Sequence, residues 1–372
     1  MRVFNSLKWA VLPLTVSLAG CSLFGGAVEG TPATLLAYMS LKSMDKVAVV
    51  NLIQRAPDGE AIPAGSAPAN MAINPRSDRE YLYVANSNTD TVSFLNVRTR
   101  QNEVPVTSGD RPWDVAITPD GRYLYVTNTG SKTVAMIDVE TRSRVKEFTF
   151  DQTAYANFSP RGIATHPITS KSANKNDAYV ISEGNAGNKG HVMILRGQQT
   201  VGAIEINGAG QLWKAAVTAD GTRLLVTDRL KNSLWSVDLS NLGTTQVTLD
   251  GNAWDVVVSL NLNKPAAFVS IPESNGHGYV QPIDLSNGVG IKGTAQSVTP
   301  VGAGSKARQP QALALNSQGT ELWVALAGSN EVVVFPQVNG VNLELGPRLV
   351  NYSYTPGQSG APEDIVLGRG VQ

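Results

Sequence analysis

The sequence has one cysteine, three histidines and no common hydrolase motif. A single cysteine, Cys21, excludes a disulfide within one copy of the chain of 372 residues. The histidines, His166, His191 and His277, include no pair at the spacing of a metal site. The chain has no His-Glu-x-x-His and no Gly-x-Ser-x-Gly sequence, which mark zinc proteases and serine hydrolases. These absences argue against a readily recognised catalytic or metal centre.

The sequence also lacks an excess of charge of either sign. Lysine and arginine total 30, aspartate and glutamate total 30, and charged residues make up only 16% of the chain. Proteins that bind nucleic acid usually carry a basic surface, so this balance disfavours a nucleic-acid partner. No long segment shows helical periodicity, and we therefore expect an all-β protein.

One apolar run stands apart from the rest, at the N-terminus. Arg2 and Lys8 give a basic start, and the apolar residues 9–18 follow. This run has the length of a signal-peptide core and is too short to span a bilayer. It ends in Leu-Ala-Gly-Cys at Cys21, and we predict that residues 1–20 are a signal peptide.

The Leu-Ala-Gly-Cys sequence resembles the lipobox of bacterial lipoproteins. The resemblance implies that Cys21 is lipidated and anchors the chain to a membrane of the cell envelope. Ser22 follows it, where an Asp would signal inner-membrane retention, so the resemblance favours the outer membrane if the organism has one. The small residues 21–33 form a predicted tether, whose average reach is roughly 20 Å. The alternative is a buried free cysteine after a chance apolar run.

The remaining chain, residues 34–372, repeats one pattern and forms one predicted domain. The pattern is Pro, two residues, an apolar triplet, a turn and a strand that is often aromatic. Aligned on its third residue, the pattern starts at Asn70, Asp114, Gly162, Lys214, Asp255 and Gln311. Periods of forty to sixty residues with about four strands each are typical of β-propeller blades.

The two ends of this domain complement each other. Residues 34–52 have the second and third strands of a blade without the first, and residues 362–369 have a first strand alone. Together they would complete a seventh blade, which closes the ring and removes open sheet edges. The sequence therefore predicts a seven-bladed β-propeller of four-stranded blades. An array of β-sandwiches would leave the complementary ends unexplained.

The stretch PDGRYLYVTN, continued by TVAMIDVET, is similar to the YVTN-repeat β-propellers of bacterial and archaeal secreted or surface proteins. The similarity is closest at residues 120–141 and covers most of the predicted mature chain. It implies the propeller fold, whereas such propellers include both binding proteins and enzymes. Sugar-lactone hydrolases also use related propellers. Some of these hold a metal in the channel with acids and amides, which Asn70, Asp114, Asp255 and Asp364 could imitate.

The first strand of each blade lines the channel, and its starting residues crowd around one mouth. We predict a ligand-binding surface there, on aromatic and charged residues that differ between blades: Trp113, Asp114, Arg161, Trp213, Lys214, Trp254, Asp255, Glu363 and Asp364. Flat indole rings suit sugars, peptide side chains or bases. The alternative is structural, with tryptophans wedged between blades and carboxylates capping neighbouring backbone N–H groups.

Two functions follow as expectations. The first is a membrane-anchored binding or scaffolding propeller without enzymatic activity or cofactor, whose mouth takes a protein, peptide or glycan of the cell envelope. The second is a metal-dependent lactone or ester hydrolase with its site in the channel. Two longer turns on the mouth side, residues 182–191 and 272–279, carry an acid and a histidine each and are further candidates for ligand contact. His166 is expected to be structural.

Overall fold

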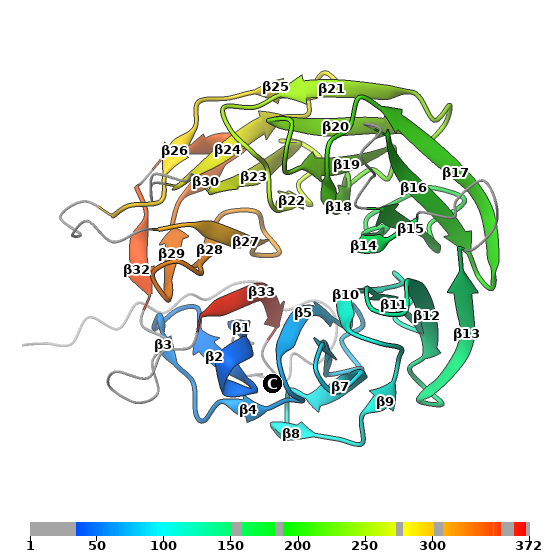
Figure 1. Ribbon diagram of the computed structural model, residues 1–372. Helices are drawn as coiled ribbons and strands as arrows, with labels where there is room; N and C mark the ends of the chain where they lie inside the picture. Colours follow the sequence, from blue (N-terminus) through cyan, green and yellow to red (C-terminus); the bar gives the residue numbers. More distant parts are fainter. Residues whose placement is uncertain are drawn as a thin grey trace, which may run out of the picture.

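The structure is a computed structural model that describes residues 35–150, 158–182, 189–272, 278–300, 308–344, 346–350 and 361–369. Seven sheets of four or five strands surround a central axis, with one extra two-stranded sheet (Figure 1). The fold is therefore an all-β seven-bladed propeller, as the repeats predict. The predicted signal peptide, Cys21 and the predicted tether lie outside the described residues.

The inner strand of each blade lines the axis and is the first strand of the repeat in six blades. The inner strands are β5 (Pro68–Ile73), β10 (Pro112–Ile117), β14 (Pro160–Thr165), β18 (Leu212–Val217), β22 (Val256–Val258), β27 (Pro310–Leu315) and β33 (Pro362–Arg369). The second strands are β6 (Tyr81–Asn86), β11 (Tyr123–Asn128), β15 (Asp177–Ser182), β19 (Arg223–Asp228), β23 (Ala266–Pro272), β28 (Leu322–Leu326) and β1 (Leu35–Leu41).

The outer half of each blade has a regular third strand and a more variable fourth one. The third strands are β7 (Thr91–Asn96), β12 (Thr133–Asp138), β16 (Lys189–Arg196), β20 (Ser233–Asp238), β24 (Gly278–Asp284), β29 (Glu331–Phe335) and β2 (Lys46–Asn51). The fourth strands are β13 (Ser143–Thr149), β17 (Gln199–Asn207), β21 (Thr244–Thr248) and β32 (Arg348–Val350), and the pairs β3 (Ala56–Pro57) with β4 (Ile62–Pro63), β8 (Gln101–Asn102) with β9 (Val106–Thr107), and β25 (Ile291–Lys292) with β26 (Gln296–Ser297). A small hairpin, β30 (Val338–Asn339) and β31 (Asn342–Leu343), is inserted before β32.

The ring closes as the complementary ends predict. β33, from the C-terminal end of the chain, pairs antiparallel with β1 and completes the sheet that β1 and β2 begin. In Figure 1 the red β33 lies beside the blue β1 on the inner side of that blade. Leu35 pairs with Arg369 and Leu41 pairs with Pro362, so both strands run the full height of the blade.

Hydrophobic packing lies between blades rather than inside them. Seven clusters of buried residues each join two neighbouring blades, which is the number of interfaces in a closed ring of seven. For example, Tyr83 and Phe94 of one blade pack with Leu124 and Val126 of the next. Each of these strands is buried on both faces, which explains why consecutive residues of YLYV are all apolar instead of alternating with polar ones. Closure therefore gives every blade two partners, including the one that the chain ends share.

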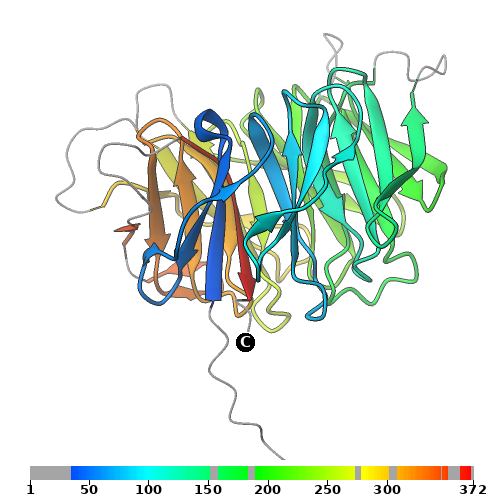
Figure 2. The same ribbon diagram turned by 90° about the horizontal axis from the view of Figure 1, so that it is seen from below.

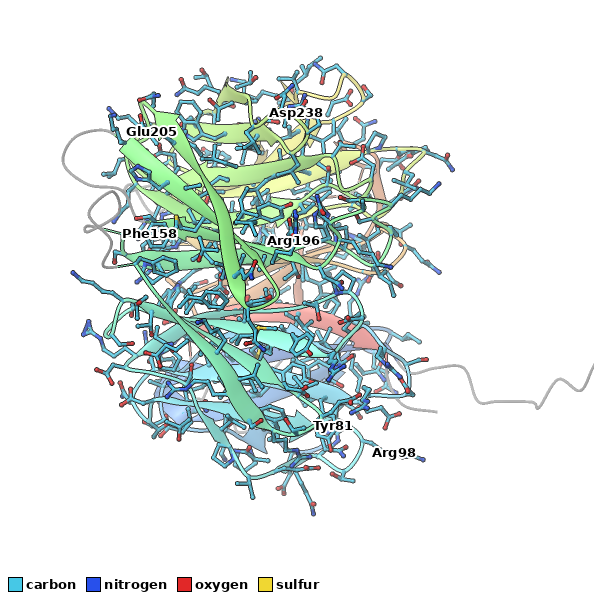
Figure 3. All side chains as sticks on the ribbon, turned by 90° about the vertical axis from the view of Figure 1, so that its right-hand side faces the viewer. Tyr81, Arg98, Phe158, Arg196, Glu205 and Asp238 are labelled. Atoms are coloured by element: carbon cyan, nitrogen blue, oxygen red, sulfur yellow. The ribbon has the colours of Figure 1, made fainter. Side chains whose placement is uncertain are left out.

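The two faces of the disc differ in which strand ends they carry. Inner strands begin on one face, which we call the mouth face, and end on the opposite face. Figure 2 shows the disc from its side, with β1 and β33 meeting at its lower edge. In Figure 3, Phe158, just before the inner strand β14, and Arg98, in a turn after β7, lie toward opposite faces. Because Leu35 pairs with Arg369 at the end of β33, the described chain begins on the face opposite the mouth.

Within the described residues, no helix is long and apolar enough to cross a bilayer. The helix found there is the three-residue 3-10 helix η1 (Lys42–Met44), in the turn between β1 and β2.

Candidate ligand site at the channel mouth

The mouth is built by a break in register at the start of the inner strands. In β10, the pairing with β11 shifts between Pro112 and Asp114, so Trp113 has no partner in the ladder. Similar shifts occur near the start of four other inner strands, β5, β14, β18 and β27. A β-bulge turns side chains away from the strict alternation of a strand. The bulges therefore let residues at this end of the strands point around the rim as well as into the channel.

A hydroxyl group on the second strand holds each of several bulges in place. Thr127 Oγ1 accepts the N–H of Asp114 at 3.0 Å and donates to the carbonyl of Arg161, in the next blade, at 2.8 Å. Thr227 makes the same two contacts, to the N–H of Lys214 and the carbonyl of Trp254. Ser40 does so for Asp364 and Ala69, and Ser270 accepts the N–H of Asp255. The hydroxyl thus positions a site residue in one blade and ties it to the next.

Five side chains at the mouth form one continuous stack. The Arg161 guanidinium carbon lies 3.8 Å from the ring centroid of Trp113 and 3.7 Å from that of Trp213. The Arg229 guanidinium lies 3.8 Å from Trp213 and 4.0 Å from Trp254. Indole rings and arginines therefore alternate over four consecutive blades in the order Trp113, Arg161, Trp213, Arg229 and Trp254. Each contact is a cation–π interaction, worth about 0.5–2 kcal/mol depending on exposure.

The stack changes how the three tryptophans are interpreted as candidate binding platforms. Two guanidinium groups within 4 Å of the Trp213 ring centroid cannot share one face, so arginines cover both faces of that ring. Trp213 is only 8% exposed, whereas Trp113 and Trp254 are partly exposed. Trp213 is therefore a support for the two arginines and not an open platform for a sugar or a base. The arginines, and not an open indole face, are therefore what the centre of the stack presents.

A second group extends the stack around the rim. Lys42, in η1, lies 5.7 Å from the Trp113 ring centroid and forms an ion pair of 3.5 Å with Glu363. Glu363 also accepts a hydrogen bond from Gln311 Nε2 at 2.9 Å. The Trp113 Nε1 atom is buried, and no acceptor lies within hydrogen-bond distance of it among the described residues. A buried indole N–H without an acceptor is destabilising unless an acceptor reaches it.

Below the stack, four charged residues meet inside the channel. Lys214 Nζ lies 2.8 Å from Asp114 Oδ1. Asp114, Asp255 and Asp364 each accept the backbone N–H of a residue in the next blade, Ile163, Leu313 and Met71, at 2.7–3.0 Å. The carboxylates therefore cap neighbouring amides, as in the structural alternative for these positions, and Lys214 partly neutralises them. We call Asp114, Lys214, Asp255 and Asp364 the channel quartet.

The lysine of the quartet reaches across an intervening blade. Asp114 comes from β10 and Lys214 from β18, and the equivalent position of β14 between them is Gly162. A Cβ atom at Gly162 would lie 2.4 Å from the backbone oxygen of Trp213, so no other residue fits without displacing that strand. The missing side chain leaves the way open for Lys214.

Burial gives the quartet unusual acid–base properties. It raises the pKa of Asp255 to about 6 and that of Asp364 to about 7, against the opposing effect of Lys214. Burial works against the charge on Lys214, but the three aspartates outweigh it and raise the pKa of the lysine. Two more negative charges than positive ones in a buried space favour proton binding by a carboxylate. The pKa values of two quartet carboxyl groups therefore lie close to neutral pH.

The same contacts test whether the channel fits a metal. The three carboxylates already hold backbone amides, Lys214 lies among them, and the Asn70 amide donates to the carbonyl of Trp113 at 2.8 Å. No group of three or more His, Cys, Asp or Glu side chains suited to a metal ion occurs in the described part of the chain. These residues do not fit the metal site that a metal-dependent hydrolase would require.

The remaining sequence candidates lie elsewhere or beyond description. His166 is buried at the far end of β14, between Tyr179 Oη and Ser170 Oγ at 3.0 Å each, and burial lowers its pKa. His191 lies in β16, 3.8 Å from a carboxylate oxygen of Glu205. Most of the two longer turns, including Glu183, Glu273 and His277, falls outside the described residues. His166 is structural, as its position at the end of a first strand predicts.

Two members of the mouth were missed by sequence reasoning. Arg229 follows the end of β19 and Lys42 lies in η1, so both belong to turns between second and third strands. Second strands end on the mouth face, so the turns that follow them lie there, and this rule of the fold was the available signal. What the sequence did not show is that these long side chains extend inward over the indole rings.

The fold and the site define a seven-bladed propeller whose mouth carries indole rings and charges of both signs. Residues 36–155, about a third of the chain, match the family described as "Lactonase, 7-bladed beta-propeller". No curated protein sequence matches the chain.

Solved structures of other propellers resemble the chain in fold. A protein of Bacteroides fragilis described as a "putative 6-phosphogluconolactonase" has a TM-score of 0.66 at 11% identity, covering 90% of this chain and 98% of its own. A protein of Bacteroides uniformis with the same description has a TM-score of 0.65 at 13% identity, covering 90% and 99%. Hydrazine synthase of Kuenenia stuttgartiensis has a TM-score of 0.59 at 21% identity, covering 72% and 76%. At these identities the likeness concerns the fold alone.

Proposed function

We propose that the protein is a membrane-anchored binding propeller whose mouth recognises an acidic group on a partner molecule of the cell envelope. The observation that carries this proposal is the stack of Trp113, Arg161, Trp213, Arg229 and Trp254. Stacking fixes each guanidinium plane in advance, so a ligand loses less side-chain entropy on binding.

The surroundings of the stack support an acidic ligand. Lys42 adds a third cation to the same arc, and the Trp113 N–H adds a neutral donor. A carboxylate or phosphate that binds several such donors gains charge-assisted hydrogen bonds, which are stronger than neutral ones. Flat stacking of a sugar or base on Trp213 is disfavoured because arginines cover both of its faces.

The test titrates the purified protein with a short polyglutamate peptide and follows tryptophan fluorescence. We expect binding that weakens with salt, and a loss of about tenfold in affinity when Arg161→Leu and Arg229→Leu are combined, since 1.4 kcal/mol corresponds to tenfold. The matched control combines Arg76→Leu and Arg98→Leu, which remove two exposed arginines from the opposite face and change the net charge equally. Equal affinity of both double variants would contradict the proposal.

A second candidate function is hydrolysis of a lactone, and the match of residues 36–155 to the lactonase family favours it. The substrate named for the Bacteroides relatives, a phosphorylated sugar lactone, is an anion that the cationic mouth could bind. The channel carboxylates do not fit a metal, so such a reaction would depend on the side chains of the mouth.

A direct assay separates the two candidates. The protein is mixed with 6-phosphogluconolactone, and acid release is measured with and without a chelator. Turnover that is lost in the Arg161→Leu and Arg229→Leu double variant would establish the lactonase function, whereas binding of the lactone without turnover would support the binding function.

Anchoring through lipidated Cys21 is the second part of the proposal. Its support is the order of basic residues, apolar run and Leu-Ala-Gly-Cys at the N-terminus. In cells, Cys21→Ala should block maturation or release the protein from the membrane fraction. A processed Cys21→Ala protein that still floats with membranes would refute the anchor.

A further inference from the structure

The face opposite the mouth carries exposed apolar side chains in its turns. Ile53 is 75% exposed and Ile168 is 61% exposed, and Leu262 and Leu242 are 49% and 41% exposed. They belong to four different blades, and each follows the end of a strand on this face. On the mouth face, Leu230 is the one comparable residue among those described, at 65% exposed. We call Ile53, Ile168, Leu242 and Leu262 the apolar tips.

Two of the four turns are basic as well as apolar. The turn after β14, residues 166–176, contains Ile168 with Lys171 and Lys175 and has no acid. The turn after β22, residues 259–265, contains Leu262 with Lys264 and has no acid. All three lysines are exposed. Several acids of other turns on this face form ion pairs with arginines, as in the pairs Asp78 with Arg76, Glu80 with Arg98 and Glu140 with Arg79. Others, such as Asp120 and Asp220, accept hydrogen bonds within their own turns.

The start of the described chain lies on the same face. Leu35 begins β1 and pairs with Arg369 at the end of β33, away from the mouth residues Glu363 and Asp364. Figure 2 shows this end of β1 at the lower edge of the disc. If residues 21–33 act as the proposed tether, their average reach of roughly 20 Å keeps the lipid close to this end of β1. A lipid on Cys21 would therefore hold this face, and not the mouth, next to the membrane.

We propose that the apolar tips and their lysines dock on an anionic bilayer surface, so that the channel mouth points away from the membrane toward its ligand. This inference rests on the proposed anchoring. Apolar side chains on a basic surface insert into the boundary between headgroups and acyl chains, and each nearby lysine adds attraction to anionic lipid. The lipid would keep this face near the bilayer, and the tips and lysines would bring it into direct contact with the lipid headgroups.

The experiment places a fluorescent label on either face of the full-length lipoprotein. Because Cys21 is the only cysteine and is acylated in the proposed form, an introduced cysteine can be labelled selectively. Ile168→Cys and Leu262→Cys report the proposed docking face. Leu230→Cys is the matched control, since Leu230 has the exposure of Ile168 and lies on the mouth face. Each protein is reconstituted in vesicles of phosphatidylethanolamine and phosphatidylglycerol that contain a nitroxide-labelled lipid as quencher.

The expected result is several-fold stronger quenching at positions 168 and 262 than at position 230. Replacing Lys171, Lys175 and Lys264 by glutamate in the labelled Leu262→Cys protein should reduce that quenching. Equal quenching on both faces, or stronger quenching at position 230, in protein that floats with the vesicles would overturn the docking while leaving the anchor intact. Protein that does not float would refute the anchor and this inference together.

Discussion

The two ends of the inner strands use their side chains in opposite ways. At the end away from the mouth, equivalent residues close the turn to the second strand. Thr118 and Thr218 each accept a backbone N–H of their own turn and donate to its aspartate, and Asn316 accepts two N–H groups of its turn. At the mouth, the equivalent positions hold indole, guanidinium, carboxylate, amide and methyl groups in different blades.

The difference separates architecture from candidate function. A residue that must close a turn in every blade is held to a few types with a short polar side chain. A residue that faces the shared axis contacts residues of neighbouring blades and of blades two positions away, so its role depends on several blades. We therefore expect substitutions at the mouth to have effects that depend on distant blades, and substitutions at the other end to have local ones.

The strongest test of this comparison is Asp114→Ala. The change leaves the N–H of Ile163 without its acceptor and takes from Lys214 its closest counter-charge, which comes from two blades away. Removing one partner of a buried ion pair costs about 3–5 kcal/mol. Urea unfolding should show a loss of about 3 kcal/mol in the free energy of unfolding, since Asp255 and Asp364 still face Lys214.

The control for this prediction is Asp110→Ala, which removes an exposed acid near the same face. Surface substitutions of this kind change stability by less than about 0.5 kcal/mol. Equal losses in the two variants would mean that the quartet does not act as a unit.

The pH dependence of stability tests the quartet through Asp364→Asn. The pKa of Asp364 is raised to about 7 in the folded protein, so its contribution is full at low pH and is lost as pH rises through 7. Asparagine can still accept the N–H of Met71 and has no such titration. Between pH 4.5 and 7.5 the variant should gain stability relative to wild type, on the order of 2 kcal/mol.

Comparing the two proteins at each pH removes effects that they share, such as the protonation of other groups. Unfolding midpoints in urea at a series of pH values give the difference directly. A difference that stays constant with pH would contradict a raised pKa at Asp364, and a difference of the opposite sign would mean that its carboxylate is stabilised when charged.

A smaller effect is expected from Thr127→Val, which keeps the shape of the side chain and removes its hydroxyl. The N–H of Asp114 and the carbonyl of Arg161 then lose a shared partner, at a cost of about 1–2 kcal/mol. Thr99→Val, at an exposed position of a turn, is the matched control and should be nearly neutral. If both valine variants unfolded at the same urea concentration, the hydroxyl would not be what ties the bulge to the next blade.

The YVTN sequence that contains Thr127 shows why the fold could be predicted from the sequence. In YVTN, residues 125–128, Tyr125 and Val126 are buried between blades, and Thr127 joins two inner strands. Asn128 Oδ1 accepts from Ser108 Oγ at 2.7 Å and so holds the loop between blades. Residues with the same role recur at equivalent positions in several blades. A repeated pattern of this kind can be recognised in the sequence. Blade number and closure were therefore predictable, as was the exposed outer strand.

The site was predictable only in part, because its contacts join blades that are far apart in the chain. Because inner strands all start at one mouth, the sequence predicted that Trp113, Trp213 and Trp254 lie near one another, and in the structure they do. It could not show that Arg161 and Arg229 cover their faces, since rotamers depend on the packed ring. The reach of Lys214 over Gly162 likewise depends on a space that only the assembled blades define.

The smallest effect is expected from exchanging equivalent residues at the end away from the mouth, with His166→Asn. Asn74 occupies the corresponding place two blades earlier, donating to Tyr83 Oη at 2.9 Å as His166 contacts Tyr179 Oη at 3.0 Å. The change should cost less than about 1 kcal/mol at pH 8, since both side chains can bond the tyrosine. Because burial lowers the pKa of His166, the folded protein resists a proton that the unfolded chain accepts, and wild type loses stability as pH falls below about 6.5. The variant should lack this loss, so its stability relative to wild type should rise between pH 8 and pH 5. If it were instead much less stable than wild type at pH 8, this end of the strands would be as specific to each blade as the mouth.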